Sequence, residues 1–202
     1  MLALVPSLAE LPFRGSRSYL HSTDLYPALT EFAKKQFSPS AFVENLTIRR
    51  AVTHQVQVNL DAPDRACGSF CIRHGNERSK GWLVETDEPV RSRVPFHEET
   101  AILSATSGAK FARLEKLLPA YTTFELLVIL TKMVAQQESA SPWWICQIGF
   151  FSPLLEIVPL ESRLKSRVSN RYLSMEIYQA GSLIGSASGI ADIAGLPAKS
   201  TP

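Results

Sequence analysis

The chain has 202 residues, of which 45% are hydrophobic and 20% charged, and this composition is typical of a globular protein with a sizeable core. Its net charge of +2 is too small to favour binding to nucleic acid or to an anionic surface. Residues 1–12 lack the basic start and the long apolar run of a signal peptide, so we expect no leader segment.

The three cysteines, Cys67, Cys71 and Cys146, are an odd number in a chain of this length. An odd number indicates a reducing environment rather than a disulfide framework, so we expect a cytoplasmic protein. Cys67 and Cys71 stand four residues apart on a predicted strand, with no histidine cluster nearby. We therefore expect small buried side chains at these positions and no metal site.

The first half is predicted to form one helix followed by antiparallel strands. Ser22 or Thr23 caps a helix that runs to about Phe37, and Pro27 falls in its first turn, where a missing N–H is tolerated. Alternating apolar and polar residues predict extended chain after this helix, and Gly75-Asn76 predicts a hairpin turn. The strand segments expected in this half are 17–21, 42–60, 66–74 and 80–85.

The second half opens with the most apolar predicted helix, over residues 121–137. Thr122 followed three residues later by Glu125 is a capping-box start, and Leu126 to Leu130 is apolar without a break. A helix that is apolar on most sides is buried, and Lys132 interrupts this one too soon for it to span a bilayer. The strands expected after it are 143–151, 160–168, 172–180 and 182–190.

The two halves match when the sequence is shifted by 101 residues. Asp24-Leu25 then falls on Glu125-Leu126, and Phe42-Val43 falls on Trp143-Trp144. Because the order of predicted elements also repeats, we predict an internal duplication. The segments predicted from it are a first repeat over 1–90, a linker over 91–113, a second repeat over 114–195 and a tail over 196–202.

A helix followed by several long antiparallel strands, occurring twice, resembles the hotdog superfamily, in which a curved antiparallel sheet wraps one long buried helix. The segments 48–58 and 149–154 are each similar to a corner of that family, although neither keeps the family's Pro-Gly-Asp turn. The resemblance covers roughly residues 17–190. It implies an α+β fold with two hotdog repeats in tandem, a double hotdog.

Members of that superfamily act on acyl thioesters of coenzyme A or of acyl carrier protein. Their acyl tail lies between two hotdog units, and the reacting carbonyl lies at a helix amino end, where free N–H groups and the helix dipole can hold an oxyanion. The resemblance therefore implies acyl-CoA or acyl carrier protein as the partner, in lipid or polyketide-type metabolism, and no cofactor of the chain's own. It also implies a pseudo-dimer within one chain, and pairing into a homodimer is compatible with it.

Asp24 and Glu125 are the first candidates for catalysis, because they are acids at matching places in the two repeats. Residues 17–24 are similar to the "R-x-Y-x-x-x-T-D" stretch of one hotdog thioesterase branch, whose last Asp is the catalytic acid, and this resemblance assigns that role to Asp24. The chain lacks the glycine-containing segment that follows in that branch. A purely structural role is the alternative for both acids, because helix starts favour acids for capping and for the dipole.

His21 is the third candidate, three residues before Asp24. In a hydroxyacyl-thioester dehydratase, His21 would remove the α-proton and Glu125 would protonate the leaving hydroxyl. The dehydratase motif "H-x-x-x-G-x-x-x-x-P" is absent, and Lys132 stands where the "D-x-x-x-Q" motif has its acid. Three functions thus remain open. They are a thioesterase that uses Asp24 or Glu125, a dehydratase, and an inactive protein that binds acyl chains or carrier protein.

Overall fold

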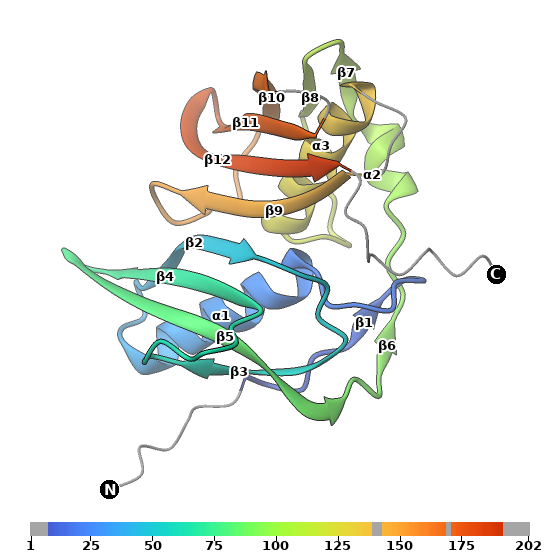
Figure 1. Cartoon of the computed structure of the whole chain (residues 1–202). Helices are drawn as coiled ribbons and strands as arrows, with labels where there is room; N and C mark the ends of the chain where they lie inside the picture. Colours follow the sequence, from blue (N-terminus) through green and yellow to red (C-terminus); the bar gives the residue numbers. More distant parts are fainter. Residues whose placement is uncertain (1–7, 139–142, 169–170, 192–202) are drawn as a thin grey trace, which may run out of the picture. The chain divides into compact units, whose positions relative to one another are not determined.

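The computed structural model describes residues 8–138, 143–168 and 171–191, which divide into two compact units. The first unit ends at Phe96 and the second begins at His97. Each unit contains one long helix packed against an antiparallel sheet (Figure 1). The predicted α+β class is confirmed, and each unit has the helix-on-sheet arrangement that the resemblance implies.

The first unit is built around helix α1 (Ser22–Gln36), which packs on strand β2 (Phe42–Ile48). The inward face of α1 includes Leu25, Leu29 and Ala33, which are fully buried. The other strands are β3 (His54–Asn59), β4 (Gly68–His74) and β5 (Glu77–Pro89), and a separate parallel pair is formed by β1 (Phe13–Arg14) and β6 (Arg93–Val94).

The strands of the first unit lie in the order β3-β5-β4-β2. The predicted hairpin is β4–β5, and Gly75 has a φ of +61° at its turn, a conformation that glycine adopts without a steric penalty. The short strand expected over 17–21 is replaced by a single bridge between Leu20 and Val52.

The second unit is built around helix α3 (Thr123–Glu138), which packs on several strands of its sheet. As the sequence predicts, α3 is buried on most sides, and Leu126 to Leu130 are each at most 2% exposed. The strands are β7 (Thr106–Gly108), β8 (Phe111–Leu114), β9 (Trp143–Phe150), β10 (Leu160–Val168), β11 (Tyr172–Gln179) and β12 (Ser182–Ala191). The sheet order is β9-β12-β11-β10-β8-β7, and the turn between β11 and β12 lies at Ala180-Gly181.

The segment 91–113 differs from the linker that the sequence predicts. It contains helix α2 (Glu99–Ser104) and strand β7, and β8 begins within it and pairs with β10. Ala112 and Leu114 of β8 are buried, so this short stretch belongs to the core of the second unit. Its apolar alternation is too short to stand out as a strand in the sequence. The predicted tail over 196–202 lies outside the described residues.

The repeat at 101 residues holds for the helix starts but not for the sheets. In the first unit, the first strand after the helix (β2) pairs with the third (β4). In the second unit, the first strand after the helix (β9) pairs with the fourth (β12). The two units therefore share their types of element and differ in strand order, so a site in one unit cannot be derived from the other by symmetry.

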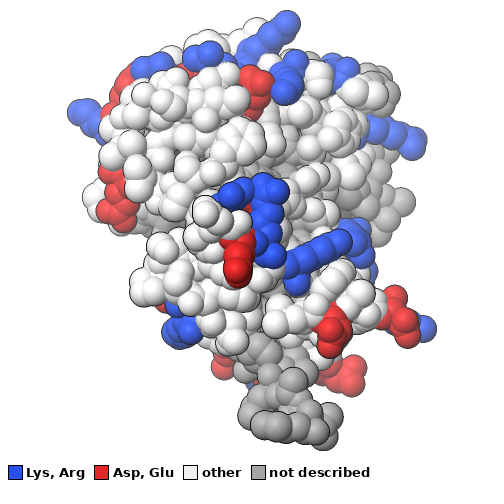
Figure 2. Space-filling view, turned by 90° about the vertical axis from the view of Figure 1, so that its left-hand side faces the viewer, with Lys and Arg blue, Asp and Glu red and all other residues white. Residues whose placement is uncertain are grey.

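None of the described helices is long and apolar enough to cross a membrane. On the face shown in Figure 2, acidic and basic side chains are interspersed rather than collected by sign. This distribution agrees with the near-neutral net charge of +2.

Candidate active site at the amino end of the first helix

Helix α1 begins with a reciprocal arrangement of His21 and Asp24. His21 is the N-cap residue in extended conformation, and its backbone N–H donates to Asp24 Oδ2 at 2.6 Å. The sequence predicts Ser22 or Thr23 as the cap, and the structure corrects this assignment by one or two residues. The carboxylate of Asp24 thus satisfies a donor that the helix itself cannot pair, and its charge complements the helix dipole.

Four consecutive polar residues are buried at this helix start. His21, Ser22, Thr23 and Asp24 are between 1% and 4% exposed. Ser22 Oγ lies 3.0 Å from His21 Nδ1, so the imidazole is fixed by a hydroxyl on the next residue. Burying polar groups costs free energy unless each is hydrogen-bonded, so such a cluster marks either a tightly satisfied structural network or a site of chemistry.

Asp24 also forms an ion pair. Arg14 Nε lies 2.8 Å from Asp24 Oδ1, and the side chain of Asp24 is fully buried. Burial raises the pKa of Asp24, while Arg17, the His21 amide and Arg14 act in the opposite direction. Asp24 therefore anchors the start of the helix through both carboxylate oxygens.

Two arginines act on this acid, and both lie over one aromatic ring. Arg17 Nη2 lies 3.4 Å from Thr23 Oγ1, and the guanidinium carbons of Arg14 and Arg17 lie 5.5 and 5.4 Å from the centre of the Phe96 ring. Arg14 was not predicted from the sequence. Its ion pair with Asp24 joins β1 to α1 across ten residues, and no local sequence motif predicts such a contact.

Glu125 takes the matching place at the start of α3. Its Oε2 accepts from the Thr122 N–H at 2.7 Å and from Thr122 Oγ1 at 3.0 Å, and Thr122 Oγ1 accepts from the Glu125 N–H at 3.2 Å. The predicted capping box is therefore confirmed, and it gives Glu125 a structural role at this helix start.

The loop between β9 and β10 lies beside this second helix start. Thr123 Oγ1 donates to the Leu155 carbonyl at 3.3 Å. The buried amide of Gln179 holds the same loop, accepting from the Leu155 N–H at 3.3 Å and donating to the carbonyls of Leu155 and Ile157 at 2.5 and 3.2 Å. Leu155 and Ile157 are 54% and 42% exposed, so the loop presents apolar side chains outward from a fixed backbone.

The cysteines are poor candidates for nucleophiles. Burial raises the pKa of Cys67 to about 11, and burial is also the main cause of the raised pKa values of Cys71 and Cys146. A thiol reacts as its thiolate, which a raised pKa makes scarce at neutral pH. Among the described residues, no three His, Cys, Asp or Glu side chains lie close enough together to hold a metal ion.

The structure thus brings His21 and Asp24 together at the start of α1 and places Glu125 at the start of α3. Two of the other three histidines lie beside hydroxyl groups of their own unit. His74 Nε2 lies 2.9 Å from Ser79 Oγ, and Nδ1 of His54 lies 3.1 Å from Thr53 Oγ1. The catalytic roles of His21, Asp24 and Glu125 remain predictions.

No protein-family model matches the sequence, and no curated protein matches it. The chain is similar to the solved structure of the dehydratase domain of PpsC from Mycobacterium tuberculosis in complex with C12:1-CoA, with 10% identity over 86% of this chain and 85% of that chain and a TM-score of 0.49. It is also similar to a protein from Thermobifida fusca YX assigned as a thioesterase II, with 8% identity over 87% of this chain and 88% of that chain and a TM-score of 0.47. Identities of 8–10% and TM-scores below 0.5 show no activity for this chain.

Proposed function

We propose that this chain is an acyl-thioester-processing enzyme and that its reaction is thioester hydrolysis at the amino end of α1. The observation that carries the proposal is the buried run from His21 to Asp24, in which an imidazole stands at the N-cap of a helix. Hydrolysis needs only a base for water and donors for the carbonyl oxygen, and this helix start contains both.

In the proposed mechanism, the carbonyl oxygen of the thioester binds at the first amides of α1, those of Ser22 and Thr23. Such amides have no carbonyl one turn earlier in the helix to accept from them, and the helix dipole adds to their attraction for negative charge. As water attacks the carbonyl carbon, negative charge develops on the oxygen that these amides hold.

His21 is the proposed base. If its Nδ1–H donates to Ser22 Oγ, which lies 3.0 Å away, the lone pair on Nε2 takes a proton from the attacking water. The imidazolium then gives this proton to the departing thiolate, so the products are a carboxylic acid and a free thiol. Asp24 keeps the backbone of His21 in place and takes no proton in this scheme, which changes its role from the predicted acid to a positioning residue.

Dehydration of a 3-hydroxyacyl thioester is the second candidate, and the burial of His21 favours it. An imidazole that is 3% exposed is well shielded from bulk water, and this suits the removal of an α-proton from a bound thioester. Dehydration additionally needs an acid for the leaving hydroxyl, for which the sequence predicts Glu125. The same proposal includes a tandem hotdog fold, acyl-CoA or acyl carrier protein as the partner, and a cytoplasmic location.

The test is turnover of a panel of acyl-CoA thioesters, followed by trapping the released thiol with a chromogenic reagent. Hydrolysis by the wild type that falls at least a hundredfold in His21→Ala supports the proposal, since general base catalysis contributes at least about that much. His97→Ala is the matched control, because the His97 side chain is exposed. Hydrolysis that survives unchanged in His21→Ala rejects the mechanism.

A 3-hydroxyacyl-CoA substrate, watched for enoyl absorbance, separates the two reactions. Loss of enoyl formation in both His21→Ala and Glu125→Gln would favour dehydration. Acyl-CoA binding without turnover of either substrate would instead support the third function open from the sequence, an inactive acyl-binding protein.

A further inference from the structure

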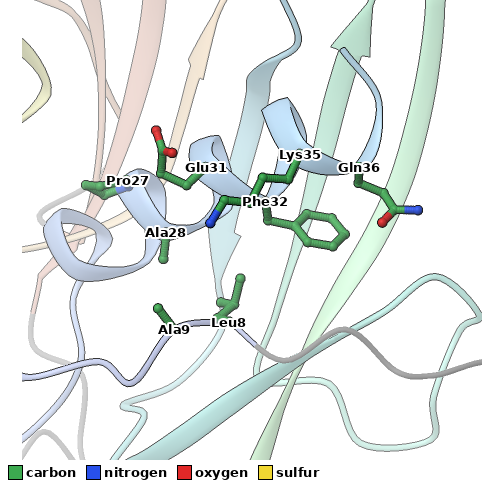
Figure 3. Close-up of a pocket in the computed structure, with 8 residues that line it drawn as sticks. All are labelled: Leu8, Ala9, Pro27, Ala28, Glu31, Phe32, Lys35 and Gln36. Carbon is green, nitrogen blue, oxygen red and sulfur yellow. The ribbon is translucent and has the colours of Figure 1, made fainter. Parts of the chain in front are cut away.

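A pocket of about 420 Å³ lies beside α1, and its lining on the helix begins at Pro27, six residues after His21. It opens between the helix and the chain segment that precedes β1, and a volume of this size is in the range of small-molecule sites. Figure 3 shows Leu8 and Ala9 facing Ala28 and Phe32 across the hollow. None of the residues predicted to be catalytic lines it.

The walls of this pocket are apolar, and its rim carries an uncompensated positive charge. Lys35 is exposed and has no hydrogen-bond or ion-pair partner in the described part of the chain, and in Figure 3 its ammonium group leans back along the helix toward Ala28. Glu31 also lines the pocket, but its carboxylate points away from the hollow and lies 3.4 Å from Lys34 Nζ.

We propose that this pocket binds a free carboxylic acid with a single apolar tail. The tail would lie between α1 and the Leu8–Ala9 segment, where apolar surface leaves water, and the carboxylate would pair with Lys35. Charge complementarity selects an anion, because the negative charge of Glu31 is turned outward and offset by Lys34. The site does not depend on the proposed catalytic role of His21.

The test is isothermal titration calorimetry of the full chain with decanoate below its micelle concentration. Decanol has the same tail without the charge, and acetate has the charge without the tail. We expect decanoate to bind more tightly than decanol, and acetate not to bind. Added salt should weaken the binding of decanoate more than the binding of decanol. Equal binding of decanoate and decanol would overturn the assignment of an anion.

Two variants locate the site. Lys35→Gln should weaken decanoate binding about three- to fivefold, as expected for a partly exposed ion pair, while Lys116→Gln, which removes an exposed lysine from the second unit, should leave it unchanged. Ala28→Phe should abolish binding by filling the hollow, with Ala28→Leu as a milder version if the first unfolds. Binding that persists in Ala28→Phe would place decanoate elsewhere and overturn the proposal, whatever the result with His21.

Discussion

Replacing Gln179 by leucine should destabilise the second unit through one loop. The side chain of Gln179 is buried, and its amide makes three hydrogen bonds to the backbone of Leu155 and Ile157. Leucine has a similar volume but neither donates nor accepts, so all three bonds are lost. At about 1 kcal/mol each, and with water replacing part of them because the loop is only partly buried, the unfolding free energy should fall by roughly 2–3 kcal/mol.

The assay is equilibrium unfolding in urea, followed by circular dichroism, with Gln147→Leu as the matched control. Gln147 lies on β9 of the same sheet and is exposed, so its replacement should change the unfolding free energy by less than about 0.5 kcal/mol. Gln179→Glu should be at least as damaging as Gln179→Leu, because a carboxylate would face two carbonyl oxygens. A Gln179→Leu protein as stable as the Gln147→Leu control would refute this account of the loop.

Three further predictions concern the first unit. Gly81→Ala should lower the unfolding free energy measured in urea by about 1–3 kcal/mol, because an added Cβ would lie 2.2 Å from Cζ of the buried Phe70 ring. A Gly81→Ala protein as stable as the wild type would show that the Phe70 ring moves aside freely. Burial raises the pKa of Asp24, so the folded state binds its proton more tightly than the unfolded state, and stability should fall as pH rises from 3.8 through the folded pKa. The stability of Asp24→Asn should not show that fall with rising pH. The same dependence of stability on pH in the wild type and in Asp24→Asn would contradict the assignment of the fall to Asp24. Burial acts to raise the pKa of Glu85, but Arg50 and the amides of Thr53 and His54 hold it below its usual value. The ionised Glu85 therefore stabilises the fold above pH 4.5, and this stabilisation should be lost as the pH falls through the folded pKa. The stability of Glu85→Gln should not change over that interval from this cause.

Local features of this fold could be predicted because they depend on neighbouring residues. The capping box of Thr122 and Glu125 and the turn at Gly75 are set by residues at most three apart, and the structure has both. The burial of α3 also follows from a continuous apolar run, since no face of that helix could remain in water.

Long-range features were missed because no local pattern encodes them. The Arg14–Asp24 ion pair and the contacts of Gln179 with the β9–β10 loop join residues that are distant in sequence. Gln55 likewise pairs with both backbone groups of Leu11, 44 residues away. Helix starts that match at a shift of 101 residues gave no sign that the two sheets order their strands differently.

An acyl-thioester site at the start of α1 with His21 as its base is best tested by the pH dependence of acyl-CoA hydrolysis in the wild type, Ser22→Ala and His21→Ala. We expect a rate that rises with pH as the proposed base loses its proton, and a lower rate in Ser22→Ala, whose imidazole has lost its 3.0 Å partner. His21→Ala should lose this pH-dependent limb. The same profile in all three proteins, or hydrolysis no faster than in buffer, would contradict it.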